Sequence, residues 1–251
     1  MIIHVVRPGE TLDTIAASYG VDPAQLGAAN EVPGDGALAV GQTLVVRFPR
    51  QVHAVRPGET LSSIAAAYGT DPRTLWQNNW ALGGGDALTV GQLLVVSYLD
   101  EKIGAAAFNG YAYPFISPQL LAAQLPYLTY MAPFTYGISA EGGLLPLDDG
   151  AMISAAIERG TRPVMHLSTL TESGQFDTER GAAVLTDYAL QDRLISEIFE
   201  TIQSKGYVGL DVDFEYLPAY LAAAYAAFLD RLHRMHRSQG LFLWAAFAPN
   251  N

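Results

Sequence analysis

The pattern of apolar and polar positions changes near residue 100. Before it, short β-branched runs such as residues 2–6 and 43–46 flank stretches in which leucine, isoleucine and alanine recur at helical spacing. After it, short apolar runs alternate with longer amphipathic stretches. Strands that alternate with helices indicate βα units and a parallel sheet. The sequence therefore predicts small α+β modules followed by an α/β domain.

The first hundred residues contain a duplicated unit. The segment His-Val-Val-Arg-Pro-Gly-Glu-Thr-Leu, which starts at His4, returns from His53 with one change. Ile-Ala-Ala, Tyr-Gly, Asp-Pro and Val-Gly-Gln then recur in the same order. A period of roughly fifty residues is typical of repeated modules. We therefore place one module at residues 2–48, a second at 51–98 and a third region at 104–251.

Each module is predicted to fold as strand, helix, helix, strand. In the first copy, Thr11 stands at the N-cap of a helix that Gly20 ends. Asp22 caps the second helix, and Pro23 lies in its first turn. A Gly-Gln turn leads into the closing strand, so both copies have the order βααβ.

Several polar and aromatic residues of the modules have both a structural and a functional interpretation. His4 and His53 stand at equivalent strand positions, which favours a scaffold role, and Asn30 is expected to hold a loop. Trp76 and Trp80 occur in the second copy alone. An exposed indole can support a sugar ring, whereas a buried one belongs to the core. The sequence leaves both roles open.

Five strands and four helices are predicted after residue 104. The strands fall at residues 105–108, 128–134, 162–167, 208–214 and 241–247, and the helices at 118–124, 149–159, 178–204 and 218–239.

Composition limits the class of ligand. Hydrophobic residues make up 50% of the chain and charged residues 16%, which is enough apolar material for folded cores. The formal net charge of −11 repels nucleic acid phosphates and anionic lipids but not a neutral sugar polymer. We therefore expect a glycan partner, no nucleic acid and no membrane.

The chain has no cysteine, so neither a disulfide nor a thiolate metal site is expected. Its first residues enter a strand pattern directly, which predicts no signal peptide. Synthesis in the cytoplasm follows from that expectation.

The strongest chemical signal is Gly-Leu-Asp-Val-Asp-Phe-Glu-Tyr at residues 209–216. Residues two apart in a strand share a face, so Asp211, Asp213 and Glu215 are predicted to project together. Three adjacent carboxylates favour retention of a proton on one of them, as a general acid near neutral pH requires. The alternatives are a solvated strand face and a divalent-metal site, and we expect no metal because a hard cation usually recruits loop carbonyl oxygens.

The duplicated pattern Pro-Gly-Glu-Thr-Leu, Ile-Ala, Tyr-Gly, Asn, Val-Gly-Gln and Leu-Val-Val resembles the LysM module. The resemblance implies a βααβ fold that binds N-acetylglucosamine-containing glycans, either peptidoglycan or chitin. It places the sugar between the first strand–helix loop and the loop before the last strand, here residues 30–38 and 79–88. The binding residues implied in the first loop of each copy are Gly9, Glu10, Thr11 and Leu12, and Gly58, Glu59, Thr60 and Leu61. Both threonines also fit the role of helix caps.

The 209–216 segment resembles the fourth-strand motif of glycoside hydrolase family 18, Asp-x-x-Asp-x-Asp-x-Glu, with Val208 in place of the first Asp. Residues 129–137 resemble the second strand of the spore peptidoglycan-lytic branch, the cortical fragment-lytic N-acetylglucosaminidases, which also carry LysM pairs. The resemblance implies a (β/α)8 TIM-barrel-type domain.

The same resemblance implies a role for each carboxylate. Glu215 protonates the glycosidic oxygen, Asp213 orients the substrate's own acetamido group as nucleophile, and Asp211 supports Asp213. No cofactor is implied, because the acetamide supplies the nucleophile. Tyr136 and Tyr216 are implied substrate-binding residues, with a core role as the alternative.

A closed barrel needs about 250 residues, so residues 104–251 are expected to form a barrel truncated after about strand five. A fragment of a longer protein is favoured over a barrel completed by self-association through its open edge, or a non-catalytic relic. The sequence thus predicts a peptidoglycan-binding glycoside hydrolase of the spore cortex or cell wall. A chitinase and a non-catalytic cell-wall or spore-coat protein are the alternatives.

Overall fold

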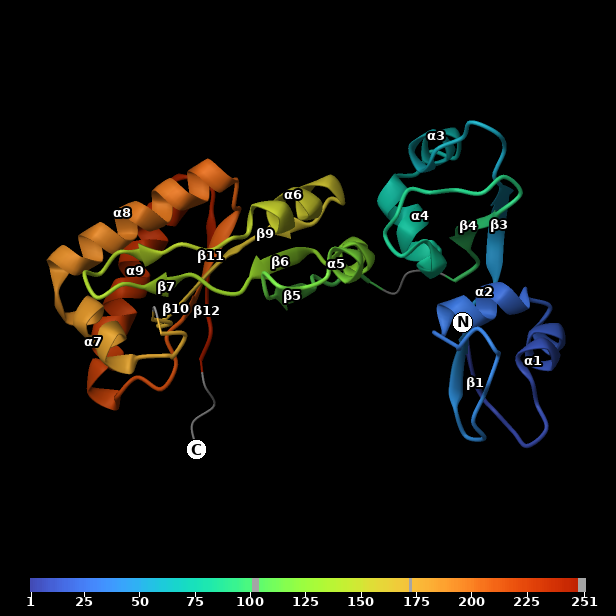
Figure 1. Cartoon of the computed structure of the whole chain (residues 1–251), viewed down its shortest axis with the longest axis horizontal. Coiled ribbons are helices and arrows are strands. Elements are labelled where there is room, and N and C mark those ends of the chain that lie inside the picture. Colours follow the sequence, from blue (N-terminus) through green and yellow to red (C-terminus); the bar gives the residue numbers. More distant parts are fainter. Residues whose placement is uncertain (101–103, 172, 248–251) are drawn as a thin grey trace. The chain divides into compact units, whose positions relative to one another are not determined.

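The computed structural model describes residues 1–100, 104–171 and 173–247. The chain divides into two compact units, which we call the N-terminal unit, residues 1–106 with 122–127, and the C-terminal unit, residues 107–121 with 128 onwards. In Figure 1 the N-terminal unit runs from blue to teal, and the C-terminal unit runs from green to red.

The N-terminal unit contains two copies of the predicted βααβ module. In the first, β1 (Ile2–Val5) pairs antiparallel with β2 (Thr43–Val46), and α1 (Leu12–Tyr19) and α2 (Pro23–Ala29) lie between them in the chain. In the second, β3 (Pro49–Ala54) pairs antiparallel with β4 (Leu93–Tyr98) around α3 (Leu61–Ala67), α4 (Pro72–Asn78) and the 3-10 turn η1 (Trp80–Leu82). The βααβ order is confirmed in both copies.

The predicted helix caps of the first module are confirmed. The Thr11 hydroxyl accepts from the backbone N–H of Thr14, whose own hydroxyl accepts from the Thr11 N–H, so the two form a capping box. Gly20 ends α1 in the left-handed conformation, and Asp22 caps α2. The same devices begin both helices of the second module.

A histidine holds together the start of each module, as the scaffold interpretation predicts. The His4 ring lies 3.1 Å from the Tyr19 hydroxyl through Nδ1 and 2.9 Å from a Glu10 carboxylate oxygen through Nε2. The backbone N–H of Arg7 donates to the same carboxylate oxygen at 2.7 Å. This N–H, followed by the His4 ring, holds the pKa of Glu10 below its ordinary value.

The second module repeats this arrangement. His53 lies between the Tyr68 hydroxyl, at 3.0 Å, and the Glu59 carboxylate, at 2.7 Å. The His53 ring, followed by the backbone N–H of Arg56, lowers the pKa of Glu59. Asn30 also plays its expected part, since its side chain bonds both Val45 N–H and Val45 C=O and ties the loop after α2 to β2.

The C-terminal unit is built from parallel strands joined through helices, as predicted. Its elements are β5 (Asn109–Ala112), α5 (Pro118–Gln124), η2 (Leu125–Tyr127), β6 (Tyr130–Pro133), β7 (Gly137–Ile138), β8 (Leu144–Leu145), α6 (Gly150–Glu158), β9 (Arg162–Pro163), β10 (Met165–Ser168), α7 (Thr178–Thr186), α8 (Tyr188–Lys205), β11 (Gly209–Asp213), η3 (Ala219–Leu221), α9 (Ala222–Ser238) and β12 (Phe242–Ala245). The start of α5 belongs to this unit, while its end and η2 are counted with the N-terminal unit.

Two three-stranded parallel sheets, β5-β6-β9 and β10-β11-β12, follow one another in the C-terminal unit. They are continuous along the chain, because residues 162–168 pass from β9 in one sheet to β10 in the other. The strand order therefore follows the chain order, and β11 is the fourth strand position. Among the described residues the sheets do not close into a barrel.

Three expected elements differ from the structure. The first strand lies at β5, not at residues 105–108, and the expected helix 178–204 is broken into α7 and α8. Asp187 causes that break, because its side chain accepts from the backbone N–H groups of Ala189 and Leu190 and so caps α8. β11 ends at Asp213, so Glu215 lies beyond the strand.

The apolar side chains of β11 form the core with the helices. Leu210, Val212 and Phe214 are buried in one cluster with side chains of α7, α8 and α9. Phe214 stacks between Tyr225 and Phe228 of α9, with ring centres 5.8 and 5.9 Å away. Figure 1 shows α8 as the long orange helix of this unit. The acidic side chains of the strand therefore face the opposite side of the sheet.

A buried carboxylate joins three elements of the C-terminal unit. Asp149, which is 1% exposed, accepts from the hydroxyl groups of Tyr136 and Tyr207 and from the Lys205 ammonium group. The Lys205 Nζ also donates to the Tyr136 hydroxyl at 2.8 Å. Burial, followed by the bond to Asp149, raises the pKa of Tyr136 to about 12. The cluster anchors the start of α6 to the end of α8.

We expect Asp149→Ala to lower the free energy of unfolding of the C-terminal unit by about 3 kcal/mol, because two buried tyrosine hydroxyls and the partly exposed Lys205 ammonium group lose their common acceptor. Urea unfolding followed by circular dichroism measures this. The neighbouring Asp148 is exposed, and Asp148→Ala is the matched control, with an expected change within about 0.5 kcal/mol. Equal effects of the two variants would contradict the role of the cluster.

The lowered pKa values of Glu10 and Glu59 predict acid sensitivity of the N-terminal unit. Their contribution is fully present above the ordinary glutamate pKa of 4.5 and is lost as the pH falls through the lower pKa of the folded chain. In thermal melts from pH 7 to pH 3, the Glu10→Gln/Glu59→Gln variant should lose less stability on acidification than the parent. Asp86→Asn, at an exposed position, should follow the parent, and parallel curves for all three would refute the prediction.

Candidate active site

Two aspartates lie on the inner side of the sheet, at the carboxyl end of β11. In the parallel register, Asp211 is paired with His166 of β10 and Asp213 with Ser168. Asp211 is 2% exposed, and the side chain of Asp213 is 18% exposed. The carboxyl ends of parallel strands are where barrel folds hold their reactive groups.

Tyr111 of β5 reaches across the sheet to Asp211. Its hydroxyl donates to Asp211 Oδ2 at 2.6 Å. Burial, followed by this hydrogen bond, raises the pKa of Tyr111 above its ordinary value, so the hydroxyl stays a donor over the working pH range. The contact joins the first and fourth strand positions, which is possible because the sheet curls.

The buried ring of His166 lies between the two aspartates and Thr135. Its Nδ1 is 2.6 Å from Thr135 Oγ1, and its Nε2 is 3.5 Å from Asp213 Oδ2 and 4.0 Å from Asp211 Oδ2. Three acceptors surround the Thr135 hydroxyl, namely the Tyr136 and His166 carbonyls and the Ser168 hydroxyl. With its single proton given to one of them, the Thr135 oxygen accepts from Nδ1–H. The His166 Nε2 thus faces both carboxylates, the position from which a proton on the ring nitrogen would offset their mutual repulsion.

Asp213 keeps one carboxylate oxygen without a partner. Its Oδ1 is buried and makes no hydrogen bond to any described residue. A buried acceptor left unpaired costs free energy, which a ligand N–H or O–H placed beside it would recover. This oxygen is thus prepared to accept a hydrogen bond from a bound molecule.

Glu215 and Tyr216 follow β11 in a turn. Glu215 is half-buried, and its carboxylate makes no ion pair or hydrogen bond within the described part of the chain. Tyr216 has a φ of 57° and is 79% exposed, so it is free to contact a ligand. The expectation of three carboxylates along one strand is corrected to two on the strand and one on the turn after it.

Tyr136 does not join this group. It is 2% exposed, and its hydroxyl is bonded to Asp149 and Lys205. Of the two alternatives, the structure places it in the core. The Tyr136 side chain points toward Asp149 at the start of α6. The sequence pattern of residues 129–137 does not reveal this long-range contact.

Tyr111, His166 and a pair of exposed aromatic rings also lie near the carboxylates, although the sequence pattern gives no sign of them. Tyr113 and Phe115 stack with ring centres 5.0 Å apart, and Tyr113 also lies 5.0 Å from Phe134, which stacks on His166. Placing the first strand at residues 105–108 hid the alternation of Tyr111 and Tyr113 at the end of β5. The aromatic group leads from solvent to the carboxylates.

The first strand–helix loop of each module, residues 9–12 and 58–61, has few free side chains. The Glu10 and Glu59 carboxylates bind within their own loops, and Thr11 and Thr60 cap helices. Leu61 is 2% exposed. The residues that the sequence assigned to these loops therefore shape them, and glycan contact by the loops stays a prediction.

Among the residues described, no group of three or more histidine, aspartate or glutamate side chains is arranged to hold a metal ion. In the same residues, no helix combines the length and apolar character that crossing a membrane requires.

Comparison with known proteins identifies the modules. The LysM domain model matches residues 4–47 and 53–97. The two matched segments fall on the two βααβ modules of the N-terminal unit.

A cortical fragment-lytic enzyme of Bacillus subtilis strain 168 is 34% identical to this chain over 254 residues. The match covers 99% of this chain and 58% of the Bacillus enzyme, so the chain spans less than two thirds of that relative.

Solved structures with the same fold include the spore cortex-lytic enzyme SleL of Bacillus cereus, with a TM-score of 0.72 and 26% identity over 99% of this chain and 58% of that one. A class V chitinase from Pseudomonas fluorescens Pf-5 has a TM-score of 0.52 and 24% identity over 58% of this chain and 46% of its own. The second likeness is one of fold alone.

The contacts of His166 predict its tautomer. Long-range proton–nitrogen NMR spectra, assigned with a His166→Asn variant, should show Nδ1 protonated, because Thr135 Oγ1 accepts from it. Thr135→Val removes the acceptor and should shift the His166 signals, while the exposed His233 should keep its own. An unprotonated Nδ1 in the parent chain would overturn the assignment.

Proposed function

We propose, from the premise that this chain carries two LysM domains and a region that matches spore cortex-lytic enzymes, that it is a peptidoglycan-binding glycoside hydrolase of the spore cortex. The observation that carries the proposal is the unpaired Oδ1 of Asp213, held beside Asp211 and His166 at the carboxyl end of β11. The finer assignment is to glycoside hydrolase family 18 and a barrel of the (β/α)8 type. Strand order and the curl shown by the Tyr111–Asp211 bond support it.

The residues have distinct parts in the proposed reaction. The substrate's acetamido N–H donates to Asp213 Oδ1, which turns the acetamido carbonyl oxygen toward the anomeric carbon. That oxygen forms a bond to the anomeric carbon while the glycosidic bond breaks, and Glu215 gives its proton to the departing oxygen. Water then opens the oxazolinium ring and returns a proton to Glu215, which retains the configuration.

Asp211 and its partners act on Asp213. The Tyr111 hydroxyl and the proton near His166 Nε2 offset the charge of the two adjacent carboxylates. As the acetamido group becomes positively charged, a proton held between Asp211 and His166 leaves Asp213 ionised. His166 is therefore a positioning residue in this proposal, as is Asp211.

The exposed aromatic rings suit a sugar substrate. Tyr113, Phe115 and Phe176 are 51%, 83% and 59% exposed around the approach to the carboxylates, and Tyr216 lies on the turn of Glu215. Aromatic faces pack against the apolar faces of sugar rings. We propose these four rings, in place of Tyr136, as substrate contacts.

Chitin is the second candidate substrate, because the fold is shared with class V chitinases. Both polymers contain N-acetylglucosamine, and the same residues would act on either. The LysM domains and the relatives favour peptidoglycan, with action in the spore cortex or cell wall.

Glu215→Gln should lower the release of reducing N-acetylglucosamine ends from cortical muropeptides by at least about a hundredfold, the usual effect of removing a general acid. Mass spectrometry of the products measures it. Glu200→Gln, on the exposed side of α8, is the matched control and should keep the parent rate.

Sedimentation with purified peptidoglycan, run in parallel, separates binding from cleavage. Parent and Glu215→Gln should sediment equally. Sedimentation without release from the parent would leave a non-catalytic wall-binding protein, and release from chitin oligomers but not muropeptides would indicate a chitinase.

A further inference from the structure

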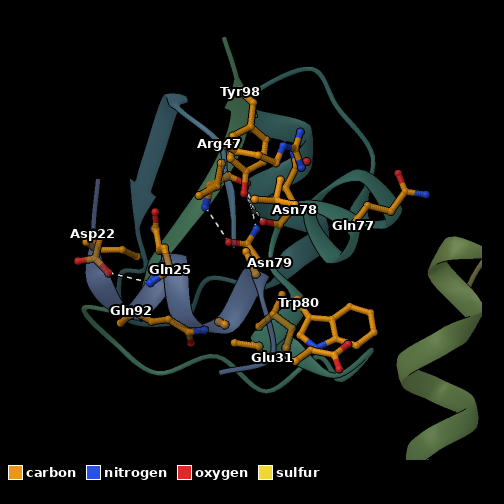
Figure 2. A pocket seen from close by; sticks show the side chains of 18 of the residues that line it. Asp22, Gln25, Glu31, Arg47, Gln77, Asn78, Asn79, Trp80, Gln92 and Tyr98 are labelled. Atoms are coloured by element: carbon orange, nitrogen blue, oxygen red, sulfur yellow. Dashed lines mark hydrogen bonds between the residues drawn. The ribbon is translucent and has the colours of Figure 1, made fainter. Parts of the chain in front are cut away.

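A cavity of about 610 Å³ lies between the two LysM modules in the N-terminal unit. Its walls come from α2 and β2 of the first module and from α4, η1 and β4 of the second, as Figure 2 shows. Tyr127 of η2 also lines it, with its ring centre 5.1 Å from that of Trp80. The volume falls in the range of small-ligand sites, roughly 300–1,000 Å³. The loops of residues 9–12 and 58–61 do not line it, whereas Glu31 and residues 79–82 of the loops that follow the second helices do. The cavity thus differs from the position expected within each module, because both modules contribute to it.

Trp80 lines this cavity with an indole ring that has no counterpart in the first module. The equivalent residue of the first copy is Glu31, and both residues line the cavity, where Figure 2 shows them next to each other. Trp80 is half-buried, and its Nε1 makes no hydrogen bond among the described residues. Trp76, in contrast, is 8% exposed and donates to Gly85 C=O at 3.0 Å, so it belongs to the core.

Unpaired amide groups also line the cavity. The Gln25 carboxamide has no partner among the described side chains, and Gln92 uses its Oε1 for the Thr89 N–H but leaves its Nε2 free. The small side chains of Ala28 and Ala29 leave space between these groups. An indole together with free amides matches a ligand that has apolar faces and hydroxyl or amide edges.

The charges at the cavity disfavour an anion. Asp22 and Glu31 line it as carboxylates, while the Arg47 guanidinium lies 3.5 Å above the Tyr98 ring and 3.6 Å from Asp100. Arg47, the basic residue among those lining the cavity, thus already has Asp100 and the Tyr98 ring as partners. The carboxylates of Asp22 and Glu31 make no ion pair within the described chain. A neutral ligand with hydroxyl donors fits, whereas a phosphate does not.

We propose that this inter-module cavity is a glycan-binding subsite, in which a neutral N-acetylated sugar ring packs on Trp80 and bonds Gln25, Gln92 and Glu31. The inference rests on the proposed wall-glycan function and adds a place where the two modules bind one strand jointly. Glu31 in the first copy and Trp80 in the second are then complementary halves of one site, which explains why the duplicated units differ there.

Tetra-N-acetylchitotetraose is the probe, titrated into the nitrogen-15-labelled full chain. The chain has three tryptophans, so each indole N–H signal can be assigned with single Trp→Phe variants. The Trp80 signal should shift saturably, and the buried Trp76 signal should not. By calorimetry, Trp80→Ala and Ala28→Trp should each weaken the inter-module binding step about tenfold, the usual effect of losing an aromatic anchor or its space.

Tyr188→Ala removes an exposed aromatic ring of α8 and serves as the matched control, with unchanged binding expected. Trp80→Phe keeps an aromatic ring and tests whether a loss in Trp80→Ala reflects folding, since its affinity should lie between parent and alanine variant. Unchanged dispersion of the amide spectra confirms that each variant is folded.

Each other outcome counts against the inference. Shifts in residues 9–12 or 58–61 without a Trp80 shift would overturn the cavity subsite and leave glycan binding by the modules standing. No response anywhere, together with no sedimentation on peptidoglycan, would refute the wall-glycan function as well. A Trp80 shift with a sugar-free wall peptide but not with the tetramer would show a peptide site instead.

Discussion

Two carboxylates side by side on one strand, nearly withdrawn from water, are the constraint on which the C-terminal unit depends. A buried charge needs hydrogen bonds or a compensating proton, and two adjacent ones need both. Asp211 obtains its donor from Tyr111, three strand positions away, which requires a curled sheet. His166 supplies the second compensation, and Thr135 fixes the orientation of its ring. The residual deficit, one unpaired oxygen on Asp213, is where we place the ligand.

The two modules are stabilised by a different kind of interaction. Their small cores are supported by a repeated polar connection of histidine, glutamate and tyrosine, so that strand, turn and first helix hold one another. Because this connection takes up the glutamates, the loops present mainly backbone to a ligand. The positions at which the copies differ, above all Glu31 in the first and Trp80 in the second, are therefore the ones that indicate a joint site of the two modules.

The proposed binding and cleavage would favour each other through effective concentration, because one chain carries both. Under the proposed function, a glycan bound by the LysM domains would remain available to the carboxylates of the same chain, and linked sites of modest affinity gain in this way without new contacts. A joint subsite between the modules would add to the residence time on a strand. The net negative charge of the chain is compatible with a neutral polymer and disfavours nucleic acid as a ligand, because it repels the phosphates.

The sequence by itself determined the two βααβ modules, their caps and the βα order of the rest, because caps, repeats and hydrophobic periods are local properties. It also determined that Asp211 and Asp213 share a face, since alternation along a strand is fixed by its pleat. It misplaced the first strand and joined α7 to α8, where one capping aspartate outweighed a continuous helical pattern. Only the tertiary structure decided that Tyr111 and His166 complete the site, that Tyr136 belongs to the core and that Trp80 faces Glu31. Those contacts join residues distant in the chain, and they depend on the curl of the sheet and the packing of one module on the other, which no local pattern encodes.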